Sequence, residues 1–160
     1  MLQNLTGSGG LWTKLLKWTG AAIIFRDYVA EVAVCSGESM EPTLRNWGDA
    51  VLIEKLTPLM REVEPGTIVV AVSPLDPHRM ICKRLVAVEG DYAPGLAGAL
   101  GQRIPKGHVW LEGDNPARSL DSREFGPVPI GLIRGRVLCK VWPLSELGAE
   151  LAARPRFSFF

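Results

Sequence analysis

The chain has 160 residues, of which 47% are apolar and 22% charged, and its formal net charge is +1 at pH 7. This length and composition fit one folded domain and exclude wholesale disorder. The near-neutral charge and the absence of a Lys/Arg block give no indication of a nucleic-acid partner. Cys35, Cys82 and Cys139 lack the spacing of a zinc motif. We interpret them as small buried apolar residues and expect no metal site.

The first predicted element is a helix over residues 11–34. Its longest uncharged run, residues 18–25, is shorter than the ~20 apolar residues of a clean membrane span. A charge at the bilayer centre costs about 2.5–3.5 kcal/mol, so a full span is penalised here. We expect membrane attachment, and the alternative is an amphipathic surface helix. The flanking charges are Lys14, Lys17, Arg26, Asp27 and Glu31.

From residue 49 onward, short runs rich in β-branched and aromatic residues are separated by turn dipeptides. No long helical pattern lies between these runs, which argues against a βαβ architecture. Residues 93–101, rich in glycine and alanine, predict a loop. The predicted fold class is therefore mainly β, with one N-terminal helix. The expected strands are residues 50–53, 67–72, 80–88, 108–111 and 137–142.

Two polar residues, each in an unusual sequence context, are candidate catalytic residues. Ser39 lies between Gly37 and Pro42, which suits a tight loop presenting its hydroxyl and its backbone N–H. A serine hydroxyl needs a base, and Lys83 lies in an apolar strand-like run where burial would favour the neutral amine. Periodicity leaves a second reading open, with Lys83 in solvent and Arg84 in an internal salt bridge.

A polar, turn-rich segment at residues 113–129 lies between predicted strands. Asp121 and Arg123 are two positions apart, which suits an ion pair that braces a loop. Ser119 offers a hydroxyl that can hydrogen-bond an amine. By itself, this segment is only a long loop.

These three segments, in this order, resemble the signature motifs of the type I signal peptidase family of Ser/Lys membrane proteases. The resemblance covers roughly residues 11–147, and its details are closest to mitochondrial members of the family. The matching motifs are Ser39-Met40-x-Pro42-Thr43-Leu44, Lys83-Arg84 with Gly90-Asp91, Gly113-Asp114-Asn115, Ser119-x-Asp121-Ser122-Arg123 and Phe125-Gly126-Pro127.

The resemblance implies a membrane-associated helical region over residues 1–34, a compact signal-peptidase-like β-domain over residues 35–147 and a tail over residues 148–160. The oxyanion hole is expected to include the Ser39 N–H. Some bacterial relatives add a serine hydroxyl two positions before the nucleophile, where this chain has Gly37, so no side-chain contribution is expected from that position. The implied site residues are Ser39 as nucleophile, Lys83 as general base, Ser119 as the residue orienting the Lys83 amine, Asp121 and Arg123 as a supporting pair, and Met40 in the substrate cleft.

The implied function is a membrane-associated serine endopeptidase that removes sorting sequences from proteins delivered to the mitochondrial intermembrane space, with no cofactor. The implied location is the inner membrane, with the β-domain facing that space; Lys14 and Lys17 favour a matrix-side N-terminus. Mitochondrial members work as two related subunits, so precursor proteins and a second subunit are the expected partners, with Arg26, Asp27 and Glu31 facing that subunit. The alternatives are a bacterial or plastid signal peptidase and an inactive scaffold subunit.

Overall fold

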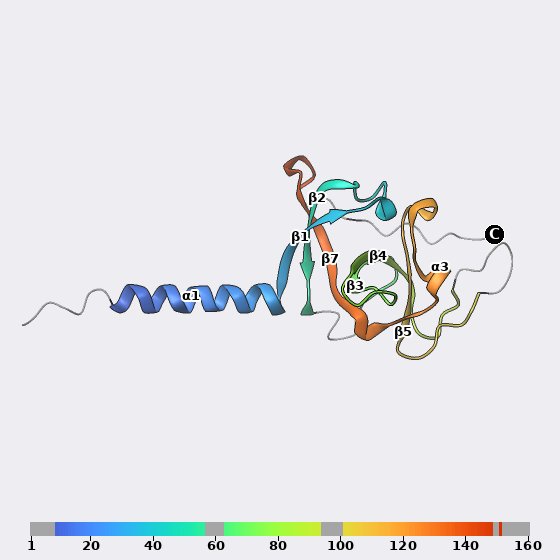
Figure 1. The fold of residues 1–160 in the computed structure, drawn as a ribbon, viewed down its shortest axis with the longest axis horizontal. Coiled ribbons are helices and arrows are strands. Elements are labelled where there is room, and N and C mark those ends of the chain that lie inside the picture. Colours follow the sequence, from blue (N-terminus) through green and yellow to red (C-terminus); the bar gives the residue numbers. More distant parts are fainter. Residues whose placement is uncertain (1–8, 57–62, 94–100, 149–150, 152–160) are drawn as a thin grey trace, which may run out of the picture.

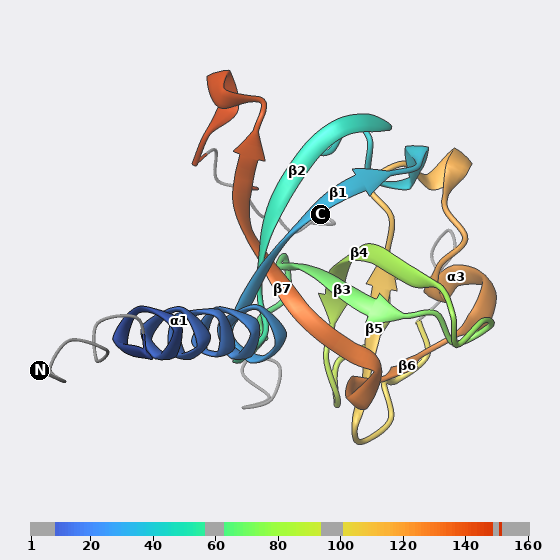
Figure 2. The same ribbon diagram turned by 60° about the vertical axis from the view of Figure 1, so that its left-hand side comes forward.

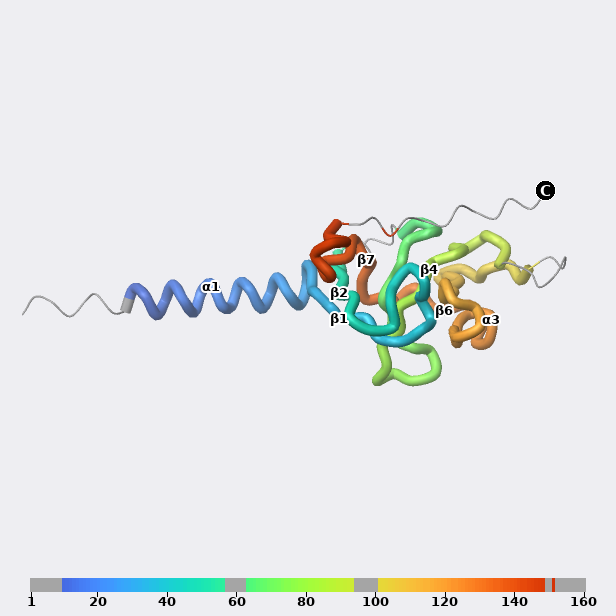
Figure 3. The backbone as a smooth tube through the Cα atoms, turned by 90° about the horizontal axis from the view of Figure 1, so that it is seen from above, coloured from blue at the N-terminus to red at the C-terminus, as the bar shows by residue number. Residues whose placement is uncertain are grey.

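A 20-residue helix, α1 (Gly9–Tyr28), extends away from a β-sheet domain in the computed structural model (Figure 1). The structure describes residues 9–56, 63–93, 101–148 and 151. Most of the predicted loop at residues 93–101 and of the tail at residues 148–160 therefore lies outside the described residues. Seen from above, α1 forms one end of the molecule and the strands form the other (Figure 3).

Large apolar side chains of α1 are exposed around the helix and do not form one apolar stripe. Examples are Trp12, Leu16, Trp18 and Ile24, each more than half exposed. This distribution contradicts the amphipathic surface helix that we considered, because such a helix has one apolar face. Within the described part of the chain, no helix is both long and apolar enough to cross a membrane.

The helix prediction was wrong at its C-terminal end. Helix α1 ends at Tyr28, and the strand β1 (Ala30–Ser36) occupies positions that we expected to be helical. Side chains of β1 alternate between half-buried and exposed, which is the two-residue period of a strand. Val29–Val34 are compatible with either period, and pairing with the next strand decides in favour of the extended form.

The described strands form one antiparallel sheet in the order β1-β2-β7-β3-β4-β5-β6 (Figure 1). All five strands predicted from the sequence are confirmed, and β1 and the two-residue β6 were not predicted. The fold class is mainly β, as expected. The bounds after β1 are β2 (Trp47–Glu54), β3 (Ile68–Val72), β4 (Met80–Ala87), β5 (His108–Glu112), β6 (Val128–Pro129) and β7 (Ile133–Trp142), with a short helix α3 (Ser122–Phe125) between β5 and β6.

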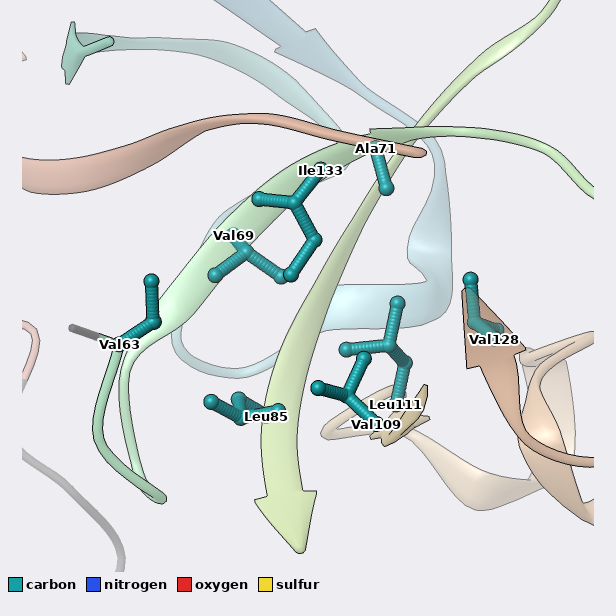
Figure 4. Packing of buried hydrophobic residues seen from close by; sticks show 8 residues of the cluster. All are labelled: Val63, Val69, Ala71, Leu85, Val109, Leu111, Val128 and Ile133. Carbon is teal, nitrogen blue, oxygen red and sulfur yellow. The ribbon is translucent and has the colours of Figure 1, made fainter. Parts of the chain in front are cut away.

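The sheet is strongly curled (Figure 2). Residues of β1 and of β4 therefore line one cleft, although three strands separate β1 from β4 in the sheet order. Two main apolar clusters fill the curled sheet. The first joins β3, β4, β5, β6 and β7 (Figure 4) and consists of Val63, Val69, Ala71, Leu85, Val109, Leu111, Val128 and Ile133. The second lies beside the loop after β1 and consists of Met40, Leu44, Val51, Ile53, Ile68 and Val137.

Lys55, just after β2, fixes the junction between α1 and β1. Its backbone N–H donates to the Val29 carbonyl at 2.9 Å, and its ammonium donates to the Arg26 carbonyl at 3.2 Å. The same ammonium forms an ion pair with Glu31, and Arg26 pairs with Asp27. These charges are compensated within the chain, so their pairing does not itself call for a second subunit.

Candidate active site

Ser39 lies in a short 3-10 turn (Glu38–Met40) that begins immediately after β1. Gly37 starts the turn with a φ of 108°, a backbone angle that L side chains rarely adopt. The Gly37 N–H donates to the backbone carbonyl and the side-chain oxygen of Asn46, both at 3.1 Å, which closes the loop between β1 and β2. The tight loop predicted around Ser39 is therefore present.

Lys83 lies in the middle of β4, and its side chain is buried, with 4% of the residue exposed. Its Nζ donates a hydrogen bond to Ser39 Oγ at 2.7 Å. The structure thus brings together two residues that are 44 positions apart in sequence. The solvent-facing alternative for Lys83 is wrong, although Arg84 is in an internal salt bridge as that alternative supposed.

The surroundings of Lys83 favour its neutral form. Burial is the largest influence and lowers the pKa of Lys83 below its ordinary value, because the ammonium loses water contacts. The charge of Asp121 acts in the opposite direction and raises this pKa, whereas Arg79 lowers it. A lysine with a lowered pKa is neutral in a larger fraction of molecules near neutral pH, which a general base requires.

Asp121 is fully buried and holds the loop after β5 together. Its carboxylate accepts hydrogen bonds from the Gly113 N–H at 2.8 Å, from Ser119 Oγ at 2.6 Å and from Arg123 Nε at 2.8 Å. Burial acts to raise the pKa of Asp121, but these hydrogen bonds, led by that of Arg123, lower it. The ion pair expected of Asp121 and Arg123 is present.

Ser119 lies next to the turn that carries Ser39. A Cβ added to Gly113 would approach Ser119 Oγ to 2.1 Å and the Ser39 carbonyl oxygen to 2.5 Å. The Asn115 N–H donates to that same carbonyl at 3.0 Å. Among the described residues, the Ser119 hydroxyl bonds Asp121, and the Lys83 ammonium bonds Ser39 without a bond to Ser119. The orienting bond expected between Ser119 and Lys83 is thus not formed in this state.

A buried ion pair between Arg84 and Asp114 lies on the face of β4 opposite to Lys83. Arg84 Nε donates to Asp114 Oδ1 at 2.8 Å, and Arg84 Nη2 donates to Asp114 Oδ2 at 2.7 Å. Thr43 Oγ1, four residues after Ser39, donates to the same Asp114 carboxylate at 2.5 Å. Sequence reasoning gave no role to Thr43 or Asp114, although both stand in the motifs that carried the resemblance. Their contact joins segments 71 positions apart, which no local pattern reveals.

Ser39 and Lys83 open onto a cleft of about 560 Å³ between β1 and β4. Met40 is 3% exposed, packs into the second apolar cluster and lines this cleft. Its place in a substrate cleft stays a prediction. No group of three or more metal-ligating side chains occurs in residues 9–56, 63–93, 101–148 and 151. The three cysteines are each partly exposed, so our interpretation of them as buried apolar residues is wrong. Other lining residues include Glu31, Ala33, Cys35, Glu38, Leu75, Arg79, Ile81, Cys82, Arg118, Leu120 and Phe125.

Comparison with known proteins identifies the family of this chain. Residues 11–93 and 95–142 match the model of the signal peptidase family, peptidase S26, and the chain belongs to this family. It is therefore a serine peptidase of the signal peptidase type.

The individual relatives reported below are subunits of a mitochondrial inner membrane protease. The chain is 49% identical to mitochondrial inner membrane protease subunit 1 of Xenopus tropicalis over 92% of this chain and 91% of that protein. It is 48% identical to human mitochondrial inner membrane protease subunit 1 over 76% of this chain and 75% of that protein. Subunit 2 of the same protease from Danio rerio is 40% identical over 75% of this chain and 68% of that protein.

Proposed function

We propose that this chain is a membrane-associated endopeptidase of the mitochondrial inner membrane that removes sorting sequences from precursor proteins in the intermembrane space. The observation that carries the proposal is the 2.7 Å contact between Ser39 Oγ and the buried Lys83 Nζ. The names of the relatives support the mitochondrial setting and the inner membrane.

Ser39 is the nucleophile and Lys83 its general base. When Lys83 is neutral, the contact reverses its polarity: the Ser39 hydroxyl donates, and the amine accepts its proton as the oxygen attacks the scissile carbonyl. The Lys83 ammonium then protonates the leaving amine. In the second half of the reaction, neutral Lys83 takes a proton from the water that hydrolyses the acyl-enzyme. Each step moves one proton through Nζ and requires no cofactor.

The loop after β5 supports this pair. Asp121 and Arg123 hold the loop through their ion pair, and Asp121 fixes the Ser119 hydroxyl. Because Ser119 donates its hydrogen to Asp121, its oxygen lone pairs remain able to accept a hydrogen bond from Lys83 when the side chains adjust to substrate. The Asn115 N–H donates to the Ser39 carbonyl and holds the turn in place, and the Ser39 N–H is the expected donor to the oxyanion.

Helix α1 attaches the β-domain to the membrane. Its exposed apolar side chains on all sides are costly in water and suit lipid or a neighbouring helix. The subunit names of the relatives support a second, related protease subunit as that neighbour. Lys14 and Lys17 favour the matrix side for the N-terminus. A cleft on the intermembrane-space side then places α1 across the bilayer with its charged residues against the neighbouring helix rather than against lipid.

The test is cleavage of a sorting-sequence precursor by the Ser39→Ala, Lys83→Met and Lys83→Arg variants, each purified with and without the related subunit. We expect kcat/KM to fall by about 10⁴-fold or more, the order found when a nucleophile–base unit loses a member. Lys83→Arg fails because guanidinium is not deprotonated in proteins. The exposed residues Ser145 and Lys106 provide matched controls, as Ser145→Ala and Lys106→Met. Near-normal turnover in any of the three variants would disprove the assignment.

Two alternatives predict different outcomes. A bacterial or plastid signal peptidase has the same chemistry, and fractionation of cells that contain the tagged protein distinguishes it from a mitochondrial one. An inactive scaffold subunit leaves Ser39 unlabelled by an active-site acylating probe, whereas the proposed enzyme is labelled at Ser39 and loses labelling in the Lys83→Met variant.

A further inference from the structure

The C-terminal end of β7 carries a small group of exposed apolar side chains. Trp142, Leu144 and Leu147 are 54%, 67% and 62% exposed, and they lie at and beside the 3-10 turn η4 (Leu144–Glu146). We call these three side chains the apolar tip. A single exposed apolar residue is ordinary on a protein surface, but three around one turn form a cluster that indicates a contact other than water.

The turn that carries the apolar tip is held in place, and the charges beside it are paired. The Gly148 N–H donates to the Lys140 carbonyl at 3.0 Å, which folds the turn back onto β7. The buried Lys140 ammonium forms ion pairs with Glu146 and with Asp49, both at 2.9 Å, and Glu146 also pairs with Arg45. Moving the tip out of water therefore leaves none of these charges without a partner.

The apolar tip lies level with the end of α1. The helix runs along the long axis of the molecule in Figure 1, and the turn after β7, drawn in dark red, lies beside the C-terminal end of the helix along this axis. Figure 3 gives the same placement from above. The last turns of α1 carry Phe25 and Tyr28, which are 57% and 66% exposed. Aromatic side chains from the helix end and from the tip therefore share one level of the molecule.

We propose that the apolar tip inserts shallowly into the lipid surface from which α1 emerges, so that the membrane holds the β-domain at two points. Trp and Tyr are enriched at membrane–water interfaces because their rings are amphipathic. Leu144 and Leu147 enter the boundary between headgroups and acyl chains, as the apolar faces of interfacial helices do. Lipid fits better than a protein partner, because a stable protein interface takes roughly 20–30 residues a side and the tip offers three. The inference rests on the proposed function in taking α1 as the membrane anchor.

A second point of contact has a consequence for catalysis. One attachment point leaves the β-domain free to tilt, whereas two points fix its orientation relative to the bilayer. Strand β7 pairs with β2, and β2 pairs with β1, which leads to Ser39, so the tip and the cleft move together. The tip therefore keeps the cleft in register with a precursor that is anchored in the same membrane, and it has no effect on a short soluble peptide.

The experiment introduces the photo-crosslinking residue benzoylphenylalanine at single positions of the full-length chain in phosphatidylcholine–cardiolipin nanodiscs, and mass spectrometry identifies the adducts. Replacement of Trp142 or Leu144 tests the tip, and replacement of Trp18 in α1 is the positive control. Leu120 is the matched negative control, because it is 54% exposed, as Trp142 is, and lies just before α3, on the side of the β-domain away from α1 (Figure 1).

We expect lipid adducts at positions 18, 142 and 144 and none at position 120. Lipid adducts at Trp18 without any at the tip would overturn the proposal and leave the membrane anchor intact. Adducts of the tip to a protein subunit in place of lipid would overturn it as well. The absence of lipid adducts at all four positions would overturn both the tip contact and the membrane attachment of α1.

A kinetic readout separates the tip from the catalytic assignment. In nanodiscs, the double variant Trp142→Ser/Leu144→Ser should raise KM for a membrane-anchored precursor by about tenfold or more. Its kcat/KM for a short soluble peptide should equal that of the wild type, and Leu120→Ser should change neither value. Equal losses with both substrates would overturn the orienting role of the tip. Lipid adducts at the tip of a wild type that cleaves neither substrate support the contact and count against the proposed function.

Discussion

Lys83 and Arg84 are consecutive residues of β4, and both are buried although their side chains leave the strand on opposite sides. Lys83 contacts Ser39, whereas Arg84 holds Asp114, which in turn accepts a hydrogen bond from Thr43. The segment that begins at Ser39 and ends at Thr43 is therefore tied to one strand at both ends. The tie at Thr43 therefore holds this segment against β4 independently of the contact between Ser39 and Lys83.

Breaking the Arg84–Asp114 pair should destabilise the protein. Arg84→Met leaves a buried carboxylate without its main counter-charge, and we expect the free energy of unfolding to fall by about 3–5 kcal/mol. The double variant Arg84→Met/Asp114→Leu removes both charges and should recover most of that loss. Urea unfolding measures both effects. A single variant as stable as the wild type would contradict the structural role of the pair.

Gly113 should tolerate no side chain, because an alanine Cβ would lie 2.5 Å from the Ser39 carbonyl oxygen. Gly113→Ala must displace the turn that carries Ser39, so we expect kcat to fall by at least about 100-fold, as for a misplacement of the order of 1 Å. Gly131→Ala is the matched control, since no atom lies within 4 Å of its added Cβ. Peptidase kinetics of the two variants provide the comparison, and equal turnover would show that the turn can shift without consequence.

The acid side of the pH–rate profile should respond in opposite directions to two charge removals. In the proposed mechanism turnover requires neutral Lys83, so the rate should rise with pH through the pKa of this residue. Arg79 lowers that pKa, so Arg79→Gln should move the rise to higher pH; Asp121 raises it, so Asp121→Asn should move the rise to lower pH.

The control for these pH profiles is Arg134→Gln, which removes an exposed charge on β7 that is not among the main influences on the pKa of Lys83. It should leave the profile unchanged. Because Arg79 is itself exposed, solvent screening keeps its effect small. Shifts of the same sign for the Arg79 and Asp121 variants would show that Lys83 is not the titrating group.

Lys83→Met should give an inactive but more stable protein. Burial lowers the pKa of Lys83 in the folded state, so the unfolded chain binds this proton more tightly. The free energy of unfolding of the wild type therefore falls furthest below that of the variant at pH values below the lowered pKa. Its stability rises with pH between that value and the ordinary 10.5. Thermal unfolding from neutral to alkaline pH should show the advantage of Lys83→Met shrinking, and a constant difference would contradict it.

The sequence predicted those parts of the fold that depend on local pattern. Runs of β-branched residues located β2, β3, β4, β5 and β7, and the Gly37 turn located the loop of Ser39. The sequence pattern could not decide whether Lys83 is buried. In an alternating strand only one of two neighbouring residues faces a single core, yet Arg84, next to Lys83, is buried as well. Asp114 explains the second buried cation, and it lies 30 positions away.

Strand β1 was missed for a different physical reason. Its residues suit a helix that continues from α1, and only the ladder with β2, from Ala30 opposite Glu54 to Ser36 opposite Trp47, makes the extended form more stable. The position of Cys35 in the cleft lining depends on the same ladder, because a helical segment would not bring Cys35 to the cleft. Both features arise from pairing between strands of the sheet, which a local sequence pattern does not reveal.

The junction between α1 and β1 has a consequence for the substrate. Only Val29 separates the end of the helix from a strand of seven residues that leads to Ser39, and Lys55 locks the turn between them. At roughly 3.3 Å per residue, that strand spans about 23 Å. If α1 is held at the bilayer, the length of β1 limits how far Ser39 lies from the lipid. Under the proposed function, a membrane-tethered precursor would then need up to about seven extended residues between its anchor and the bond that is cleaved.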